Sequence, residues 1–336
     1  MKERNKTIDN AKGIGIILVI VGHLYTKDSI PFMYIFSFHM PLFFIISGYL
    51  MNADKYSTLT ECAKTSFVRY VKPYFAFCII GFFITLPVNG GGIFLGKYTL
   101  TQLTTRILYE TFWTINPFVF FMGSLWFLIV LFLSIVFGWF LINKLWKSPK
   151  KFYVLVVLPI ISYGLYIFQN LSFMPEYAQQ SLPLKIASVP ICTMFILLGY
   201  ELKIRKFEFK LSYVTLFTFL AVIVVIPYNG SVNISIPYFG NMVLFVMNAV
   251  LGSYTVLSLS SIKFPKFIEW FGQNSLIIFA THGVWIIVYT QVIKFLFGYS
   301  ELLAIHRITG LLIVVGLSLP TVKIVTPLLN YILRKI

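Results

Sequence analysis

Charged side chains are scarce in this sequence. Asp, Glu, Lys and Arg together make up 11% of its 336 residues, and 11 residues are acidic. Soluble domains carry about 25% charged residues, so the composition excludes an ordinary water-soluble domain. Apolar residues make up 58% of the chain and the mean hydropathy is +0.86. They fall in many runs near the ~20 residues that cross a bilayer. The composition predicts an all-α, polytopic integral membrane protein.

Cysteine is also rare. Cys62, Cys78 and Cys192 have neither the spacing of a disulfide framework nor that of a metal site. We therefore expect no disulfide and no metal ligands. Basic residues outnumber acidic ones and give a net charge of +16. In a soluble protein this charge would suggest a nucleic-acid partner, but in a membrane protein the placement of basic residues indicates topology, so we expect no nucleic acid.

The apolar runs predict about ten transmembrane helices in a single integral-membrane domain, residues 1–336, with no separate soluble domain. The N-terminal MKERNK before an apolar run resembles a signal peptide. That run contains Lys12 and has no convincing small-residue cleavage site, so we interpret it as the first span. The predicted spans are 8–26, 31–51, 71–88, 117–142, 152–169, 184–201, 211–227, 238–259, 274–296 and 302–323.

The basic residues predict the orientation. With the N-terminus in the cytoplasm, 21 of the 27 basic residues lie on the cytoplasmic side, as the positive-inside rule expects. An even number of spans places both termini there. We expect a multi-pass protein of the cell membrane, in contact with membrane lipids, and the sequence is compatible with both a monomer and a homo-oligomer. The outer side keeps Lys27, Lys97, Arg106, Lys185, Lys294 and Arg307.

The longest connection between spans is 89–116, on the outer side. Its glycine run, 90–92, predicts a turn. Residues Thr101–Trp113 carry apolar side chains on one helical side and polar ones on another. This pattern predicts an interfacial helix, and a lid over an outward-facing site is the alternative.

The first span carries three titratable residues. Because each residue of a helix turns about 100°, Asp9, Lys12 and His23 share one stripe, with Lys12 and His23 about 16 Å apart. Titratable groups in hydrocarbon are costly unless they face a packed or hydrated interior, so the stripe is a candidate site. The alternatives are a packing histidine and a lysine whose amine reaches the membrane interface. Gly13 beside Lys12 would permit close approach of a helix or a ligand.

Other candidates lie on later spans. His39 in the second span has a depth comparable with that of His23, and it is either catalytic or a structural partner of a neighbouring helix. His282 reaches mid-membrane in the ninth span, and Arg307 at the outer start of the last span either reaches the interface or holds an anionic group of an acceptor. Arg69 and Lys72, just before the third span, are a topology signal or a phosphate-binding pair.

Several motifs together resemble acyltransferase family 3, a family of integral-membrane acyltransferases. They are ID-x2-KG from Ile8 with the Lys12-x10-His23 pattern, FHMPLFFIISGYL in the second span, RYVKPY before the third, SLWFL at Ser124–Leu128, and GQNSLIIFATH in the ninth span. The resemblance extends from Ile8 to His282 and covers most of the chain.

The resemblance implies a ten-span enzyme that moves an acyl group, commonly acetyl, from cytoplasmic acyl-CoA to a sugar hydroxyl of a surface or exported glycan. It makes Lys12 and His23 the essential pair, and Arg69 with Lys72 the motif on the donor side. The family more often has arginine at the position of Lys72. Some relatives carry a fused esterase-like domain, for which this sequence has no segment.

The residues fit acyl transfer from a thioester to an alcohol, which needs a base, donors for the oxyanion and a grip on phosphates. His23 is expected to act as general base or as an acylated relay, with Asp9 orienting the system and His39 as a further catalytic candidate. Trp126, His282 and Arg307 are candidate substrate-binding residues beside Arg69 and Lys72. Acyl-CoA is expected as a substrate rather than a bound cofactor, and a glycan or lipid-linked sugar as acceptor.

A transporter or flippase for a lipid-linked sugar or small solute is the competing hypothesis. In that case the buried titratable residues would be substrate or proton-coupling sites. A receptor or scaffold is least favoured, because it gives no reason for so many buried titratable groups.

Overall fold

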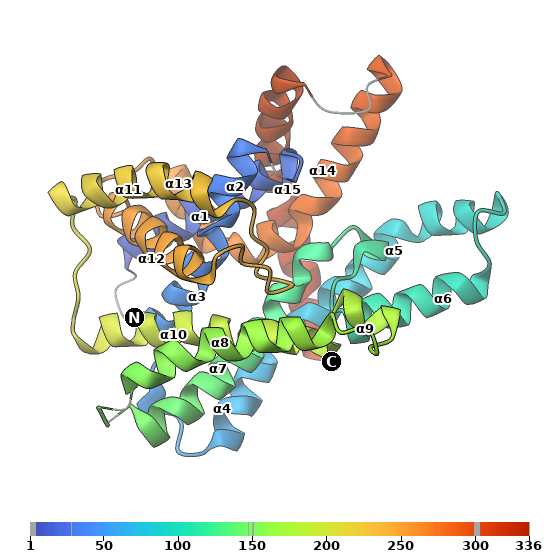
Figure 1. Ribbon diagram of the computed structural model, residues 1–336. Coiled ribbons are helices and arrows are strands. Elements are labelled where there is room, and N and C mark those ends of the chain that lie inside the picture. Colours follow the sequence, from blue (N-terminus) through green and yellow to red (C-terminus); the bar gives the residue numbers. More distant parts are fainter. Residues whose placement is uncertain (1–4, 28, 147, 150, 299–302, 336) are drawn as a thin grey trace.

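The computed structural model describes residues 5–27, 29–146, 148–149, 151–298 and 303–335, and most of them are in helices (Figure 1). One isolated β-bridge, between Asn233 and Tyr238, lies outside them. The helices are α1 (Lys6–Leu24), α2 (Ile30–Phe36), α3 (His39–Leu50), α4 (Leu59–Ser66), α5 (Lys72–Phe94), α6 (Leu100–Leu108), α7 (Trp126–Leu145), α8 (Lys151–Gln169), α9 (Glu176–Gln180), α10 (Val189–Ile204), α11 (Tyr213–Asn229), α12 (Met242–Leu259), α13 (Lys266–Gln273), α14 (Ser275–Phe297) and α15 (Ala304–Lys335).

The prediction of a polytopic, all-helical membrane protein is confirmed. Among the described residues, nine helical segments are long and apolar enough to cross a membrane, and α11, with 17 residues, is a shorter apolar helix at the predicted seventh span. The nine are Lys6–Leu24, Ile30–Leu50, Leu59–Phe94, Gly123–Leu145, Lys151–Gln169, Pro183–Ile204, Met242–Leu259, Ser275–Phe297 and Ala304–Lys335.

Several boundaries differ from the predicted ones, among them the start of the fourth span, which lies at Gly123 rather than at 117. The glycine run 90–92 is not a turn, because α5 continues through it to Phe94; glycine is common in membrane helices, where a broken backbone would leave polar groups without partners. The second span is divided between α2 and α3 at Ser37 and Phe38. The last helix runs to Lys335, past the predicted end at 323.

Figure 1 shows α5 and α6 extending away from the other helices.

The predicted interfacial helix forms α6 and the π-helical turn η3 (Tyr109–Trp113). Its start is fixed by a capping box. The Thr99 side chain accepts a hydrogen bond from the Gln102 N–H, and the Gln102 side chain accepts one from the Thr99 N–H. Such a box satisfies two of the N–H groups that a helix start leaves free.

Two glycine-mediated crossings bring backbones together in the centre of the molecule. A methyl group at Gly48 of α3 would overlap the Ile196 carbonyl of α10, and one at Gly199 of α10 would overlap the Ile45 carbonyl. The same arrangement joins α1 to α13, where a methyl group at Gly13 would overlap the Ile268 carbonyl. Without a hydrophobic force between helices in lipid, small residues allow the close packing that holds them. These crossings fix α1 and α3, the helices of His23 and His39.

We expect Gly199→Ala to destabilise the protein by about 1–3 kcal/mol or more, because the new methyl group meets a backbone carbonyl that cannot move aside. Gly164→Ala in α8 is the matched control, since a methyl group there meets no atom within 4 Å. Thermal unfolding of both variants in detergent measures the difference. Equal unfolding temperatures would contradict this account of the crossing.

Candidate active site

A cavity of about 410 Å³ lies at the N-terminal end of α1 and contains three cationic side chains, Lys12, Lys55 and Arg69. We call it the cationic cavity. Helices α1, α3, α7 and α14 form its walls, together with the segment from α3 to α5. Its lining residues are Lys12, Phe43, Ile46, Ser47, Leu50, Met51, Asn52, Lys55, Tyr56, Ser66, Arg69, Tyr70, Phe127, Leu128, Leu131, Ile135, Ser275, Leu276 and Phe279.

Arg69 reaches this cavity from an irregular turn. Residues Phe67–Val71 form the π-helical turn η2 between α4 and α5, and such turns are frequent at functional sites. The Arg69 guanidinium lies 5.4 Å from the centroid of the Tyr70 ring. Lys72 follows the turn, is half-buried and does not line the cavity. The structure thus places Arg69, and not Lys72, at the cavity.

Lys55 belongs to the short helix η1 (Ala53–Lys55), which follows α3. Its amine lies 5.7 Å from the centroid of the Tyr56 ring. Burial raises the pKa of Tyr56 above its usual value, so its hydroxyl stays a neutral hydrogen-bond donor at neutral pH. Two cations and a neutral donor of this kind suit an anionic group such as a phosphate.

A second cavity, of about 330 Å³, lies at the C-terminal end of α1 and contains three of the four histidines. We call it the histidine cavity. Lys12 and His23 are eleven residues apart on α1, so their positions are separated by about 16 Å along that helix. The lining residues are Val19, His23, Phe36, His39, Met40, Asn116, Phe118, Phe121, Gly123, Ser124, Trp126, Asn233, Ile234, Ser235, Phe279, His282, Gly283, Ile286 and Ile287.

The three imidazoles come from α1, α3 and α14. The rings of His23 and His282 have centroids 5.1 Å apart, and the Phe36 ring lies 5.7 Å from His23 and 4.8 Å from His39. His39 and His282 are buried, whereas His23 is exposed to the cavity. His23 is therefore the imidazole most accessible to a molecule in this cavity.

Hydrogen bonds fix the tautomers of two of these histidines. His39 Nδ1 lies 2.7 Å from the Ile35 carbonyl oxygen, and His282 Nδ1 lies 2.7 Å from that of Phe279. A carbonyl only accepts, so in the neutral ring Nδ1 carries the proton and Nε2 carries the lone pair. Within the described part of the chain the His23 ring makes no hydrogen bond. Both of its nitrogens can therefore meet a substrate.

The break between α2 and α3 orients His39. Pro41 has no N–H and cannot donate to the carbonyl one turn earlier, and the chain leaves helical geometry at Phe38 (φ −143°). Ser37 Oγ donates to the Met33 carbonyl 2.7 Å away. The His39 ring bonds the Ile35 carbonyl across the break, which turns the imidazole toward the cavity.

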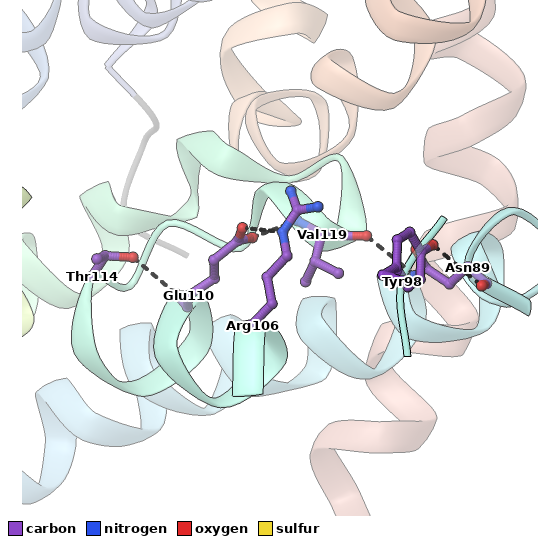
Figure 2. Close-up of polar contacts among 6 residues, drawn as sticks. All are labelled: Asn89, Tyr98, Arg106, Glu110, Thr114 and Val119. Carbon is purple, nitrogen blue, oxygen red and sulfur yellow. Dashed lines mark hydrogen bonds and ion pairs between the residues drawn. The ribbon is translucent and has the colours of Figure 1, made fainter. Parts of the chain in front are cut away.

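A polar network holds one wall of the histidine cavity (Figure 2). Glu110 Oε1 pairs with Arg106 Nε at 2.6 Å, and Glu110 Oε2 accepts from the Val119 N–H at 2.5 Å. The Glu110 carbonyl accepts from the Asn116 N–H at 2.8 Å. This network connects α6 and η3 to the segment that carries Asn116 and Phe118. The interfacial helix itself does not line the cavity, but it positions the segment that does.

The connection between α11 and α12 supplies Asn233 and Ser235 to the same cavity, and the Ser235 hydroxyl donates to Asn233 Oδ1 at 2.8 Å. Val232 and Ile234 of this segment are buried. The Ser188 hydroxyl donates to the Ser235 carbonyl at 3.2 Å. The segment therefore enters the helix bundle rather than crossing over its surface.

The remaining predicted site residues lie in different places. Trp126 lines the histidine cavity, and its indole N–H makes no hydrogen bond within the described part of the chain. Asp9 is buried on α1, where a methyl group at Gly272 of α13 would overlap its carbonyl. The Arg307 guanidinium lies 4.7 Å from the centroid of the Tyr25 ring and does not line either cavity.

The sequence analysis did not select several residues that line the cavities: Asn52, Lys55, Tyr56, Asn116, Asn233 and Ser235. All lie in connections between helices, where no apolar periodicity predicts their direction. Lys55 gave a signal only as a basic residue close behind the second span. Asn116 and Asn233 gave none, because they meet the cavity only through the tertiary fold.

Comparison with known proteins gives one family. The family model described as an acyltransferase domain, that of acyltransferase family 3, matches residues 5–326. No curated protein matches the chain, and no solved structure matches it. The matched region includes every residue that lines the two cavities.

We expect solid-state NMR of the protein labelled with ¹⁵N-histidine to show a protonated Nδ1 and an unprotonated Nε2 for His39 and His282 at neutral pH, because each Nδ1 donates to a carbonyl. The resonances are assigned by their loss in His39→Asn and His282→Asn variants. A protonated Nε2 in either residue would show that its carbonyl contact does not exist in the membrane.

Proposed function

The chain belongs to acyltransferase family 3, and on that basis we propose that it is an O-acyltransferase that moves an acyl group, most often acetyl, from acyl-CoA to a hydroxyl of a cell-envelope glycan or lipid-linked sugar. One observation carries the proposal. Helices α1, α3, α7 and α14 each line both the cationic cavity and the histidine cavity, with different residues of α1, α3 and α7 facing each one. A donor bound at one end of these helices can thus extend toward a base at the other.

The cationic cavity suits the phosphates of coenzyme A. Arg69 offers the planar fork that binds phosphate oxygens in pairs, and Lys12 and Lys55 offer point charges. The apolar side chains of Phe43, Phe127 and the neighbouring residues suit the thin pantetheine arm. Most basic residues lie in segments at this end, so the positive-inside rule supports a cytoplasmic donor site with both termini in the cytoplasm.

The histidine cavity suits a sugar hydroxyl. The amides of Asn116 and Asn233 and the hydroxyl of Ser235 can exchange hydrogen bonds with sugar hydroxyls, and Phe118 and Trp126 offer rings on which a sugar can pack. In a cell membrane this cavity would face outward. Arg307, close to the same end of α1 but outside the cavity, remains a candidate for an anionic group further along the acceptor.

The transfer step needs one neutral imidazole. The lone pair of His23 takes the proton of the acceptor hydroxyl as its oxygen attacks the thioester carbonyl carbon. The C–O bond forms, the C–S bond breaks, and the imidazolium returns the proton to the departing thiolate. Trp126 lines the same cavity, and its N–H would donate to the developing oxyanion; such donors are worth about 10²–10³ in rate.

His23 acting as a nucleophile is the second form of the same mechanism. Its nitrogen would attack the thioester carbonyl carbon, the C–S bond would break, and coenzyme A would leave as the thiol. The acceptor hydroxyl would then attack the acyl carbon, the C–N bond would break, and neutral His23 would be restored. His39 and His282, with their Nε2 lone pairs, are then available as bases for the acceptor. Asp9 and Lys12, one helical turn apart on α1, would balance charge at the donor end.

We expect His23→Ala, folded and inserted like the wild type, to lose acyl transfer by about 10²–10⁴-fold, the usual worth of a general base. The assay follows labelled acetyl-CoA with reconstituted protein and added glycan lipid. Label retained on wild-type protein would favour the acyl-histidine route. A His23→Ala variant with the wild-type rate would overturn the proposed mechanism, and saturable solute transport without acyl donor would favour a transporter.

Arg69→Ala and Lys55→Ala should each raise the KM for acetyl-CoA about 10-fold or more with little change in kcat, because a charge-assisted hydrogen bond contributes about 1.5–3 kcal/mol. The matched control is Lys64→Ala, which removes an exposed cation of α4 outside the cavity. We expect Lys72→Ala to have a smaller effect than Arg69→Ala. Equal effects of Lys64→Ala and Arg69→Ala would mean that only net charge matters.

A further inference from the structure

The cationic and histidine cavities have one lining residue in common among the described residues, Phe279 of α14. The residues before and after it on α14 line different cavities. Ser275 and Leu276, before it, line the cationic cavity, while His282 and Gly283, after it, line the histidine cavity. On α7, Trp126 lines the histidine cavity and the next residue, Phe127, lines the cationic cavity. The two cavities are therefore separated by a layer about one side chain thick.

Aromatic rings make up this layer. The Phe279 ring has its centroid 5.2 Å from that of Phe127 and 5.9 Å from that of His282. Phe127 is in turn surrounded by Phe43 and Phe44, at 6.1 and 5.0 Å. Phe279 itself is buried, with 6% of its surface exposed. A ring fixed on several sides can move little, so Phe127 is the static part of the layer.

The backbone of Phe279 is held independently of its ring. Its carbonyl accepts a hydrogen bond from His282 Nδ1 at 2.7 Å and another from Ser124 Oγ at 3.0 Å. The ring contacts the rings of Phe127 and His282. Because the hydrogen bonds of the carbonyl do not involve the ring, a change of side chain at position 279 alters the layer but keeps the carbonyl that orients His282.

We propose that Phe279 is a specificity-determining residue, whose ring sets the cross-section of the acyl groups that reach His23. The inference rests on the proposed function. Coenzyme A phosphates bound by Arg69 lie on one side of the ring, and the thioester carbonyl must meet His23 on the other. The acyl group must pass the ring first. A narrow acyl group such as acetyl passes, whereas a branched or aromatic acyl group is rejected.

The experiment compares acetyl-CoA, isobutyryl-CoA and benzoyl-CoA as donors for protein reconstituted in liposomes, with octyl glucoside and water as acyl acceptors. Release of free coenzyme A, measured by mass spectrometry, gives kcat/KM for each donor. The variants are Phe279→Ala, Phe279→Leu and Phe279→Trp. Phe137→Ala is the matched control, because this α7 side chain is half-buried and lines neither cavity.

We expect Phe279→Ala to raise the isobutyryl-to-acetyl and benzoyl-to-acetyl ratios of kcat/KM at least 10-fold, with Phe279→Leu in between. Phe279→Trp should lower acetyl turnover without changing the Kd of acetyl-CoA, which is held by its phosphates. Phe137→Ala should leave all ratios as in the wild type. If Phe279→Ala does not fold, the Leu and Trp variants test the same order.

Two failures are distinguishable. If wild-type protein turns over acetyl-CoA faster than His23→Ala, but the Phe279 variants keep the wild-type ratios, the inference about Phe279 is wrong and the proposed function stands. If wild-type protein releases coenzyme A no faster than His23→Ala from any donor, both the proposed function and the inference that rests on it are overturned.

Discussion

Hydrocarbon offers no hydrogen bonds, and the position of each polar group in this protein follows from that constraint. Backbone groups are paired inside helices, which continue even through the glycines of α5. Charged side chains lie at cavities or helix ends, as Arg69 and Lys55 do. The imidazoles of His39 and His282 bond the backbone carbonyls of Ile35 and Phe279. The close glycine crossings fix α1 against α13 and α3 against α10, and α1 and α3 belong to the walls of both cavities.

Apolar run length was enough to predict the number and approximate positions of the membrane helices, because a bilayer imposes one length on every crossing. The motifs around Lys12, His39, Arg69, Trp126 and His282 identified the family. Sequence could not give the π-helical turn that carries Arg69 or the break before His39. Both depend on packing against other helices, and a local pattern contains no information about those neighbours.

Which of the predicted residues line each cavity could also be learned only from the fold. Arg69 and Lys72 are neighbours in sequence, yet only Arg69 lines the cationic cavity, because η2 changes the direction of successive side chains. Arg307 and His282 both belong to the C-terminal part of the chain, but Arg307 stacks on Tyr25 outside the histidine cavity. Asn116 and Asn233 come from connections whose course is set by buried contacts, such as those of Val232 and Ile234.

The thinness of the layer at Phe127 and Phe279 has an electrical consequence. In the proposed enzyme the two cavities open to opposite sides of the membrane, so each would bring the potential of its side inward and the voltage would fall mainly across the rings between them. A unit charge that crosses there works against about 2.3 kcal/mol per 100 mV. A neutral thioester crosses without this cost, whereas a proton or a thiolate does not. The membrane voltage would therefore change the rate of any step that moves charge past these rings.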